Sequence, residues 1–179
     1  MSARPGPDAL LELIRAGGLP LPQSGIQFPG RPLIVHEHAP TRTMGEAREN
    51  LAFDVARIVK TIAFVRRAPS GKTLVLAALR GTRRVDYAKL AGLCGVNRRD
   101  LAALSPAEVL ERVGVEPGGV SPLHGHPALG LGALLLIDED ALGIAPTLYC
   151  GSGRPDRTLE LAPADLLALS GGRPGAFSR

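Results

Sequence analysis

The chain has 179 residues, of which 45% are hydrophobic and 21% charged, and its formal net charge is +4. This length fits one domain with a sizeable core, and the composition excludes wholesale disorder. The longest apolar stretch, residues 129–137, is too short to cross a membrane, and the N-terminal residues lack the pattern of a signal peptide. The two cysteines lack metal-ligand spacing, so we expect free thiols in a cytoplasmic protein with no membrane partner.

The first half of the chain predicts two short helices, a linker and three strands. A pair of glycines closes the first helix, and Thr43 with Glu46 forms a Thr-x-x-Glu capping box that opens the second. Two apolar, β-branched segments flank a Ser-Gly-Lys turn, which indicates a hairpin. In chain order, the predicted elements are a helix over 8–16, a linker over 19–32, a strand over 33–36, a helix over 43–50, and hairpin strands over 58–65 and 73–79.

The second half carries clear helix-start signals and one irregular segment. Asp86 is placed to cap a helix, and Ser105, Pro106 and Glu108 give the next helix a capping box with a first-turn proline. Residues 116–122 contain too much glycine and proline for regular structure. The remaining predicted elements are helices over 87–93, 105–113 and 164–169, strands over 131–137, 147–150 and 157–161, and a Gly-rich tail.

Helices interspersed with antiparallel hairpins predict an α+β domain with a mixed, strongly twisted sheet. The sequence contains no internal repeat and no convincing interior boundary. We therefore divide it into an N-terminal helix and linker extension, residues 1–32, and one folded domain, residues 33–179.

Lys60 interrupts an otherwise apolar predicted strand. It shares a face with Ile58, Ile62 and Phe64, because side chains alternate along a strand. A lysine in that position either extends to solvent or meets an anion, since burying an unpaired ammonium is costly. The second interpretation places a cation on the floor of a pocket that receives a negatively charged ligand.

The Gly/Pro segment offers a complementary feature. Gly118 and Gly119 let the backbone approach a ligand closely, and Pro117 and Pro122 stiffen both ends of the loop. Its amide N–H groups could thus be preorganised as hydrogen-bond donors. A tight structural turn would use similar residues.

Other site motifs are absent or weak. His36 and His38 would share a strand face and could bind a metal, but no carboxylate or cysteine completes a ligand set, so a surface pair is favoured. His124 and His126 are expected in a solvated loop. No nucleophile elbow, Walker loop or dinucleotide fingerprint is present. We therefore expect neither a metal nor another cofactor.

Four segments in fixed order resemble the YbaK family, also called the prolyl-tRNA synthetase associated or editing domain family. They are Ile-Val-Lys-Thr-Ile-Ala-Phe at 58–64, Leu-Ala-Ala-Leu-Arg-Gly-Thr-Arg-Arg-Val-Asp at 76–86, Glu-Pro-Gly-Gly-Val-Ser-Pro at 116–122 and Leu-Ala-Pro-Ala-Asp-Leu at 161–166. The resemblance extends over residues 36–169 and depends on the order and spacing of the segments.

The resemblance implies an α+β fold whose twisted, partly barrel-like sheet is surrounded by helices. It also implies a trans-acting hydrolase that cleaves the ester between a wrong amino acid and the 3′ adenosine of a tRNA. Lys60 would hold the phosphate or ribose of the terminal nucleotide, and Gly118 would place a backbone group near the ester. Water or a ribose hydroxyl would complete the chemistry. The implied substrate-binding residues are Thr43, Met44, Gly119, Val120, Ser121, Pro122, Gly151 and Ser152.

The sequence departs from the family pattern in one place. Related proteins carry a Ser-Gly-Gly-Lys-Arg-like stretch followed by an aspartate, where this chain has Cys150–Gly151–Ser152–Gly153–Arg154 and Thr158 near the place of the acid. Ser152 and Asp156 are candidates to replace the serine and the aspartate.

Two functions follow. The first is a deacylase of mischarged aminoacyl-tRNA, such as tRNA(Pro) carrying alanine, cysteine or serine, with an aminoacyl-tRNA synthetase as a possible partner. The second is a non-catalytic module or regulator that holds a tRNA acceptor end. A hydrolase of another small ester or nucleotide is a weaker third. The net positive charge suits a phosphate-bearing partner, whereas aromatic residues are only 3%, which disfavours base-stacking platforms.

Overall fold

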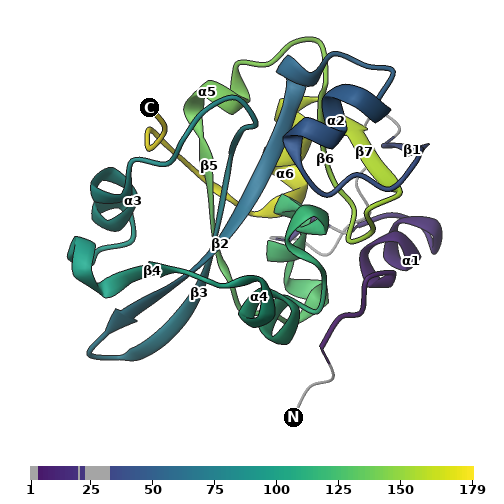
Figure 1. Ribbon diagram of the computed structural model, residues 1–179. Coiled ribbons are helices and arrows are strands. Elements are labelled where there is room, and N and C mark those ends of the chain that lie inside the picture. The colour runs from purple at the N-terminus through teal and green to yellow at the C-terminus, as the bar shows by residue number, and fades with distance from the viewer. Residues whose placement is uncertain (1–3, 20, 23–32) are drawn as a thin grey trace.

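The computed structural model describes residues 4–19, 21–22 and 33–179. Its centre is an eight-stranded mixed sheet of order β1-β7-β6-β2-β3-β5-β8, with β4 paired to β2 (Figure 1). The strands are β1 (Ile34–Glu37), β2 (Ile58–Ala68), β3 (Gly71–Arg80), β4 (Leu101–Ala103), β5 (Leu134–Asp138), β6 (Leu148–Gly151), β7 (Arg157–Leu161) and β8 (Arg173–Gly175).

Helices and short 3₁₀ turns connect these strands and cover the sheet. The helices are α1 (Ala9–Arg15), α2 (Met44–Asn50), α3 (Tyr87–Leu93), α4 (Pro106–Val113), α5 (Glu139–Leu142) and α6 (Pro163–Ser170). The 3₁₀ turns are η1 (Val55–Arg57), η2 (Arg98–Asp100), η3 (Pro117–Gly119), η4 (Pro122–Gly125) and η5 (Pro127–Leu129). The predicted α+β class with a mixed, twisted sheet is confirmed.

Most predicted elements are confirmed, and the exceptions have physical reasons. The predicted loop over 116–122 contains η3 and the start of η4, because prolines at the first turn of each favour single helical turns. The supposed Gly-rich tail contains β8, and β4 and α5 were not predicted. Most of the predicted linker over 19–32, and the proposed domain boundary at residue 32, lie outside the described residues.

Alternation along β2 divides the core between the two faces of the sheet. Val59 and Ala63 join the larger cluster, which also contains residues of α1, α4 and α6. Phe64, on the other face, joins a smaller cluster with β3 and α3. Helices α1 and α3 lie on opposite sides of the molecule (Figure 1). Lys60 therefore projects from the same face as Phe64, as the sequence predicts.

The N-terminal helix packs against the rest of the domain. Leu10 and Leu11 are buried in the larger core cluster. The segment before α1 lies close to two glycines. A Cβ atom added to Gly114 would lie 2.0 Å from the Pro5 carbonyl oxygen, and one added to Gly153 would lie 2.4 Å from the Pro7 carbonyl oxygen. Both glycines also have positive φ. These contacts fix the N-terminal segment onto the domain that forms the site.

Asp138 fixes the C-terminal segment to the sheet. Its buried carboxylate accepts hydrogen bonds from the amides of Phe177 and Ser178 and from the Ser178 hydroxyl, each at 2.8 Å. Phe177 is fully buried in the smaller core. An apolar replacement would leave these donors unsatisfied.

We expect Asp138→Ala to lower the free energy of unfolding by about 3 kcal/mol, because each buried donor left without a partner costs about 1–3 kcal/mol. Urea denaturation measures the loss. Glu111→Ala, at an exposed position on α4, serves as the control and should leave stability nearly unchanged. A loss below about 1 kcal/mol for Asp138→Ala would contradict this role for the carboxylate.

Candidate functional site

A cavity of about 360 Å³ opens between α2, the start of β2, η3 and the turn between β6 and β7. Its wall is mainly apolar, and its polar side chains come from the segment before α2, from β2, and from β6, β7 and the turn between them. The lining residues are His38, Thr41, Arg42, Thr43, Met44, Ala47, Leu51, Ile58, Val59, Lys60, Thr61, Ile62, Ala63, Leu104, Pro106, Val109, Pro117, Gly118, Val120, Tyr149, Cys150, Gly151, Arg154, Pro155, Arg157 and Thr158.

The cavity lies where β2 lacks a neighbour on one edge. Strand β6 pairs with Ile58 and Val59, and β4 pairs with residues 64–66, so neither of these strands covers residues 60–63. The Ala63 carbonyl accepts a hydrogen bond from the Leu104 amide. Thr61 lies within the gap, and its buried Oγ1 has no hydrogen-bond partner among the described residues. Residues 60–63 of β2 therefore form part of the cavity wall.

Strand register places three of the lining residues on one face of the sheet. Val59 pairs with Cys150 in parallel, so Lys60 and Gly151 both face the opposite way. Gly151 pairs with Thr158 in antiparallel register, and paired residues present their side chains to the same face. Lys60, Gly151 and Thr158 therefore form a row across β2, β6 and β7.

Glycines allow three backbone segments to meet at the cavity, because glycine has no side chain to separate them. A Cβ atom at Gly118 would lie 2.5 Å from the Arg42 carbonyl oxygen, and one at Gly151 would lie 2.6 Å from the Val120 carbonyl oxygen. The Gly153 amide donates to the Gly119 carbonyl at 2.8 Å. Residues 118–120 are thus held between the segment before α2 and the end of β6.

Lys60 is half-buried, and its ammonium is held in place by backbone oxygens. Nζ donates to the carbonyls of Gly81 at 3.1 Å and Arg83 at 2.6 Å. Burial, and secondarily the nearby Arg84 charge, lowers the pKa of Lys60 from its ordinary value. An ammonium has three N–H groups, so one remains for a ligand.

The other cations of the cavity are paired with carboxylates. Arg42 pairs with Glu116 at 2.8 Å. Arg154 and Arg157 each lie 2.9 Å from the Asp156 carboxylate. The hydrogen bond from Arg154, and then the charges of both arginines, lower the pKa of Asp156. Within the described part of the chain, Lys60 is thus the cavity cation that has no carboxylate partner.

The predicted backbone donors are only partly available. The Gly119 amide donates to Glu116 O at 2.9 Å, and the Val120 amide donates to Pro117 O at 3.3 Å, which closes the η3 turn. The Gly118 amide has no acceptor among the residues described, and Gly118 lines the cavity. The amide of Gly118 is therefore the donor of this loop that a ligand could use.

Thr43 and Met44 line the cavity at the start of α2. The Thr43 hydroxyl caps α2 by accepting from the Glu46 amide at 3.1 Å, as predicted. Glu46 accepts from the Arg42 amide rather than from that of Thr43, so only half of the capping box forms. Met44 packs on Gly81, whose backbone also holds Lys60.

Gly119, Ser121, Pro122 and Ser152 do not line the cavity. Buried Ser121 accepts from the Leu123 amide, and buried Ser152 donates to the Arg157 carbonyl at 2.8 Å. Both hydroxyls thus stabilise turns. The substrate-binding role of these four residues stays a prediction.

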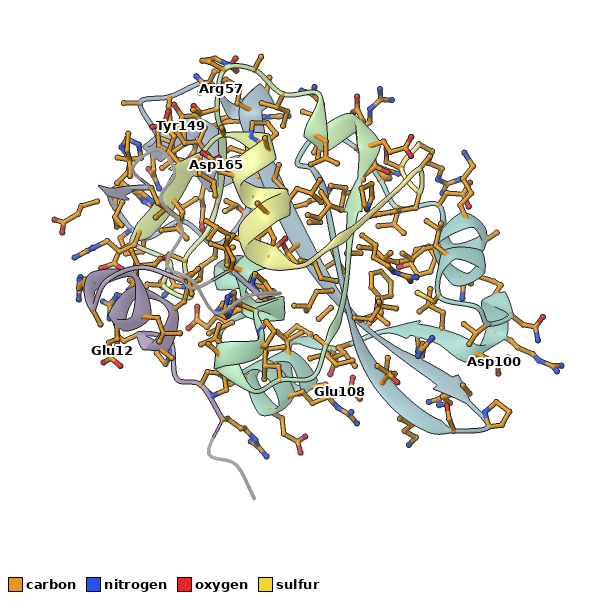
Figure 2. The ribbon with its side chains drawn as sticks, turned by 180° about the vertical axis from the view of Figure 1, so that it is seen from behind. Glu12, Arg57, Asp100, Glu108, Tyr149 and Asp165 are labelled. Atoms are coloured by element: carbon orange, nitrogen blue, oxygen red, sulfur yellow. The ribbon has the colours of Figure 1, made fainter. Side chains whose placement is uncertain are left out.

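An aromatic cluster borders the cavity. Phe53 stacks on Tyr149 with 3.8 Å between ring centroids, and the Arg57 guanidinium lies 4.8 Å from the Tyr149 ring. Figure 2 shows Arg57 and Tyr149 at the same end of the molecule. His36 contacts both rings, and its Nε2 lies 2.6 Å from Glu160. His36 is thus held by a contact with Glu160, whereas His38, two residues later, lines the cavity.

His124 supports the Gly/Pro loop from inside the protein, contrary to the expected solvated position. Its Nδ1 accepts a hydrogen bond from the Ser121 amide at 2.8 Å. Burial lowers the pKa of His124 to about 4. The unfolded chain would therefore bind a proton near pH 6.5 that the folded protein binds only near pH 4, so stability falls as pH falls through this window.

We expect the wild-type protein to lose about 2 kcal/mol of unfolding free energy between about pH 7 and about pH 5 through His124. The unfolding free energy of His124→Gln should lack this dependence on pH, because glutamine does not titrate. Urea denaturation at both pH values measures the difference. An equal change in unfolding free energy between the two pH values for both proteins would contradict the assignment of a buried neutral imidazole.

Comparisons with known proteins agree on one family. The family model for the aminoacyl-tRNA editing domain matches residues 38–169. The uncharacterized protein YwhH of Bacillus subtilis is 29% identical over 130 residues, which are 72% of this chain and 74% of that protein.

Solved structures extend the comparison. A crystal structure with the provisional description of a trans-editing enzyme for prolyl tRNA synthetase is 31% identical, with a TM-score of 0.65, over 82% of this chain and 87% of that one. Another, of a hypothetical protein, is 24% identical with a TM-score of 0.73 over 95% and 99% of the two chains, and supports the fold. The chain thus belongs to the aminoacyl-tRNA editing domain family, which confirms the resemblance found in the sequence.

Proposed function

We propose that this protein is an aminoacyl-tRNA deacylase that hydrolyses the ester of a mischarged tRNA, in particular tRNA(Pro) carrying a small amino acid. The observation that carries the proposal is the common cavity of Lys60 and Gly118. Among the described residues, Lys60 supplies a cation without a carboxylate partner, and Gly118 supplies an amide without an acceptor. Together they match a substrate with an anionic backbone and an ester carbonyl.

The chemistry expected here is orientation and electrostatic stabilisation. Cys150 lines the cavity, but burial raises the pKa of its thiol to about 12, so it is protonated at neutral pH and a poor nucleophile. Lys60 would anchor the ribose or phosphate of the terminal nucleotide, and the Gly118 amide would face the ester. The cavity volume of about 360 Å³ lies at the small end of ligand sites, which suits a small amino acid.

The test is hydrolysis of a panel of tRNA(Pro) molecules charged with alanine, cysteine, serine or proline, together with correctly charged tRNAs as controls. We expect faster hydrolysis of at least one small mischarged residue than of prolyl-tRNA(Pro). Salt-sensitive binding without hydrolysis of any ester would contradict the deacylase and favour the acceptor-end binding module. A synthetase as a stable partner stays a prediction.

A further inference from the structure

We propose that His38 and Thr158 form a proton-relay pair that activates the hydrolytic water, an inference that rests on the proposed deacylase function. His38 Nε2 lies 2.7 Å from Thr158 Oγ1, and His38 Nδ1 lies 2.7 Å from the Ala39 carbonyl oxygen. Both residues line the cavity that contains Lys60 and Gly118. A base, a hydroxyl and an orienting acceptor are thus in line at the candidate site.

The hydrogen bonds define the direction of proton transfer. The Ala39 carbonyl can only accept, so Nδ1 of His38 carries the proton, and Nε2 of the neutral ring is an acceptor. Thr158 therefore donates its hydroxyl proton to Nε2. The lone pairs of Thr158 Oγ1 remain available to accept a hydrogen bond from water.

Strand pairing holds the two residues together across 120 positions of sequence. His36 pairs with Thr158 between β1 and β7, so His38 shares the face of Thr158. The His38 amide donates to Asp156 O at 3.2 Å. Gly151, opposite Thr158 on β6, contributes no side chain, and the 118–120 backbone lies over this face. Thr158 therefore lies next to the loop that would face the ester.

The proposed reaction needs only water as co-reactant. Water gives a proton to Thr158 Oγ1 while Thr158 gives its own to His38 Nε2, and the water oxygen forms a bond to the ester carbon. The bond between that carbon and the ribose oxygen then breaks. The proton returns from His38 through Thr158 to the ribose oxygen, which leaves a free amino acid and a tRNA with its terminal hydroxyl.

The charged groups around His38 form ion pairs, except Lys60, which donates to backbone carbonyls. They are Glu37 on β1, Arg154, Asp156 and Arg157 at the β6–β7 turn, Arg42 before α2 and Lys60 on β2. Ion pairs join Arg157 to Glu37 at 3.3 Å and to Asp156 at 2.9 Å, and Arg154 to Asp156 at 2.9 Å. Arg42 pairs with Glu116 and Lys60 with backbone carbonyls. The His38 ring itself is engaged by the Ala39 carbonyl and the Thr158 hydroxyl.

The test compares Thr158→Val and His38→Gln with wild type in single-turnover hydrolysis of the panel substrate that wild type cleaves fastest. Both variants should be slower by about 100-fold, at the low end for general-base catalysis. The double variant should be no slower than either single variant, because the two residues act as one unit. Thr158→Ser keeps the hydroxyl and should retain most of the wild-type rate.

The pH profile separates a chemical role from a structural one. The relay requires Nε2 of His38 to accept the Thr158 proton, so the wild-type rate should fall in acid; His38→Gln should lack this fall. His36→Gln removes the histidine paired with Glu160 and should keep the wild-type profile. An unchanged acidic limb in His38→Gln, or an aminoacyl ester trapped on Thr158, would overturn the relay. Failure of wild type on the whole panel would instead overturn the proposed function.

Discussion

Replacing Lys60 with methionine is expected to lower kcat/KM for ester hydrolysis by at least about 100-fold, the usual effect of removing one preorganised electrostatic group. Methionine keeps much of the length and apolar stem of lysine but removes the cation and its donors. The ammonium is already fixed by Gly81 O and Arg83 O, so it meets the substrate without reorganisation. The measurement is single-turnover deacylation over a range of enzyme concentrations.

Two comparisons interpret the Lys60 result. Lys72→Met removes an exposed lysine from the β2–β3 turn region and should leave the rate unchanged, although the net charge changes equally. Lys60→Arg keeps the charge, but its larger planar group cannot reproduce both carbonyl contacts, so we expect only partial recovery. Thermal melting of each variant separates lost folding from lost activity. A Lys60→Met protein that folds and retains the wild-type rate would contradict the anchoring role.

Gly118→Ala is expected to affect both stability and activity. The added Cβ would lie 2.5 Å from the Arg42 carbonyl oxygen and 2.8 Å from its Cα, so the two backbone segments must separate. Overpacking of this kind costs about 1–3 kcal/mol. A shift of about 1 Å in the loop that faces the ester would slow hydrolysis by about 100-fold. Urea denaturation and single-turnover hydrolysis measure the two effects.

Gly92→Ala is the matched control for this change. Gly92 lies on α3, and a Cβ atom there would have no neighbour within 4 Å. Alanine in a helix interior is more favourable than glycine by about 1 kcal/mol, so this variant should be slightly more stable and fully active. If Gly118→Ala behaves like Gly92→Ala in both measurements, the close contact of residues 42 and 118 is unimportant.

The fold could be largely predicted because its signals are local. Ser105 and Glu108 form the capping box of α4 that their spacing predicts. Alternation along β2 correctly predicts the face that Lys60 shares with Phe64. The sequence does not predict β8, because its three residues include a proline and a glycine. It is held by pairing with β5, and the residues that follow it are held by the buried Asp138 carboxylate. Such long-range contacts leave no periodic pattern.

The site could be predicted only in part for the same reason. Lys60, Gly118, Thr43, Met44, Val120 and Gly151 all line one cavity. The sequence suggested that all amides of the Gly/Pro loop were available, but a 3₁₀ turn uses that of Gly119. The contact between His38 and Thr158 depends on the register of β1 with β7, which composition and spacing do not specify.

The most direct test of the central claim is a crystal structure with a non-hydrolysable 3′-alanylamino-adenosine, in which an amide replaces the ester. We predict that the alanyl amide lies in the cavity, with its carbonyl next to the Gly118 amide and the nucleotide ribose or phosphate within hydrogen-bond distance of Lys60 Nζ. Binding of the analogue elsewhere on the protein, with the cavity empty, would contradict the assignment of this cavity as the aminoacyl-tRNA site.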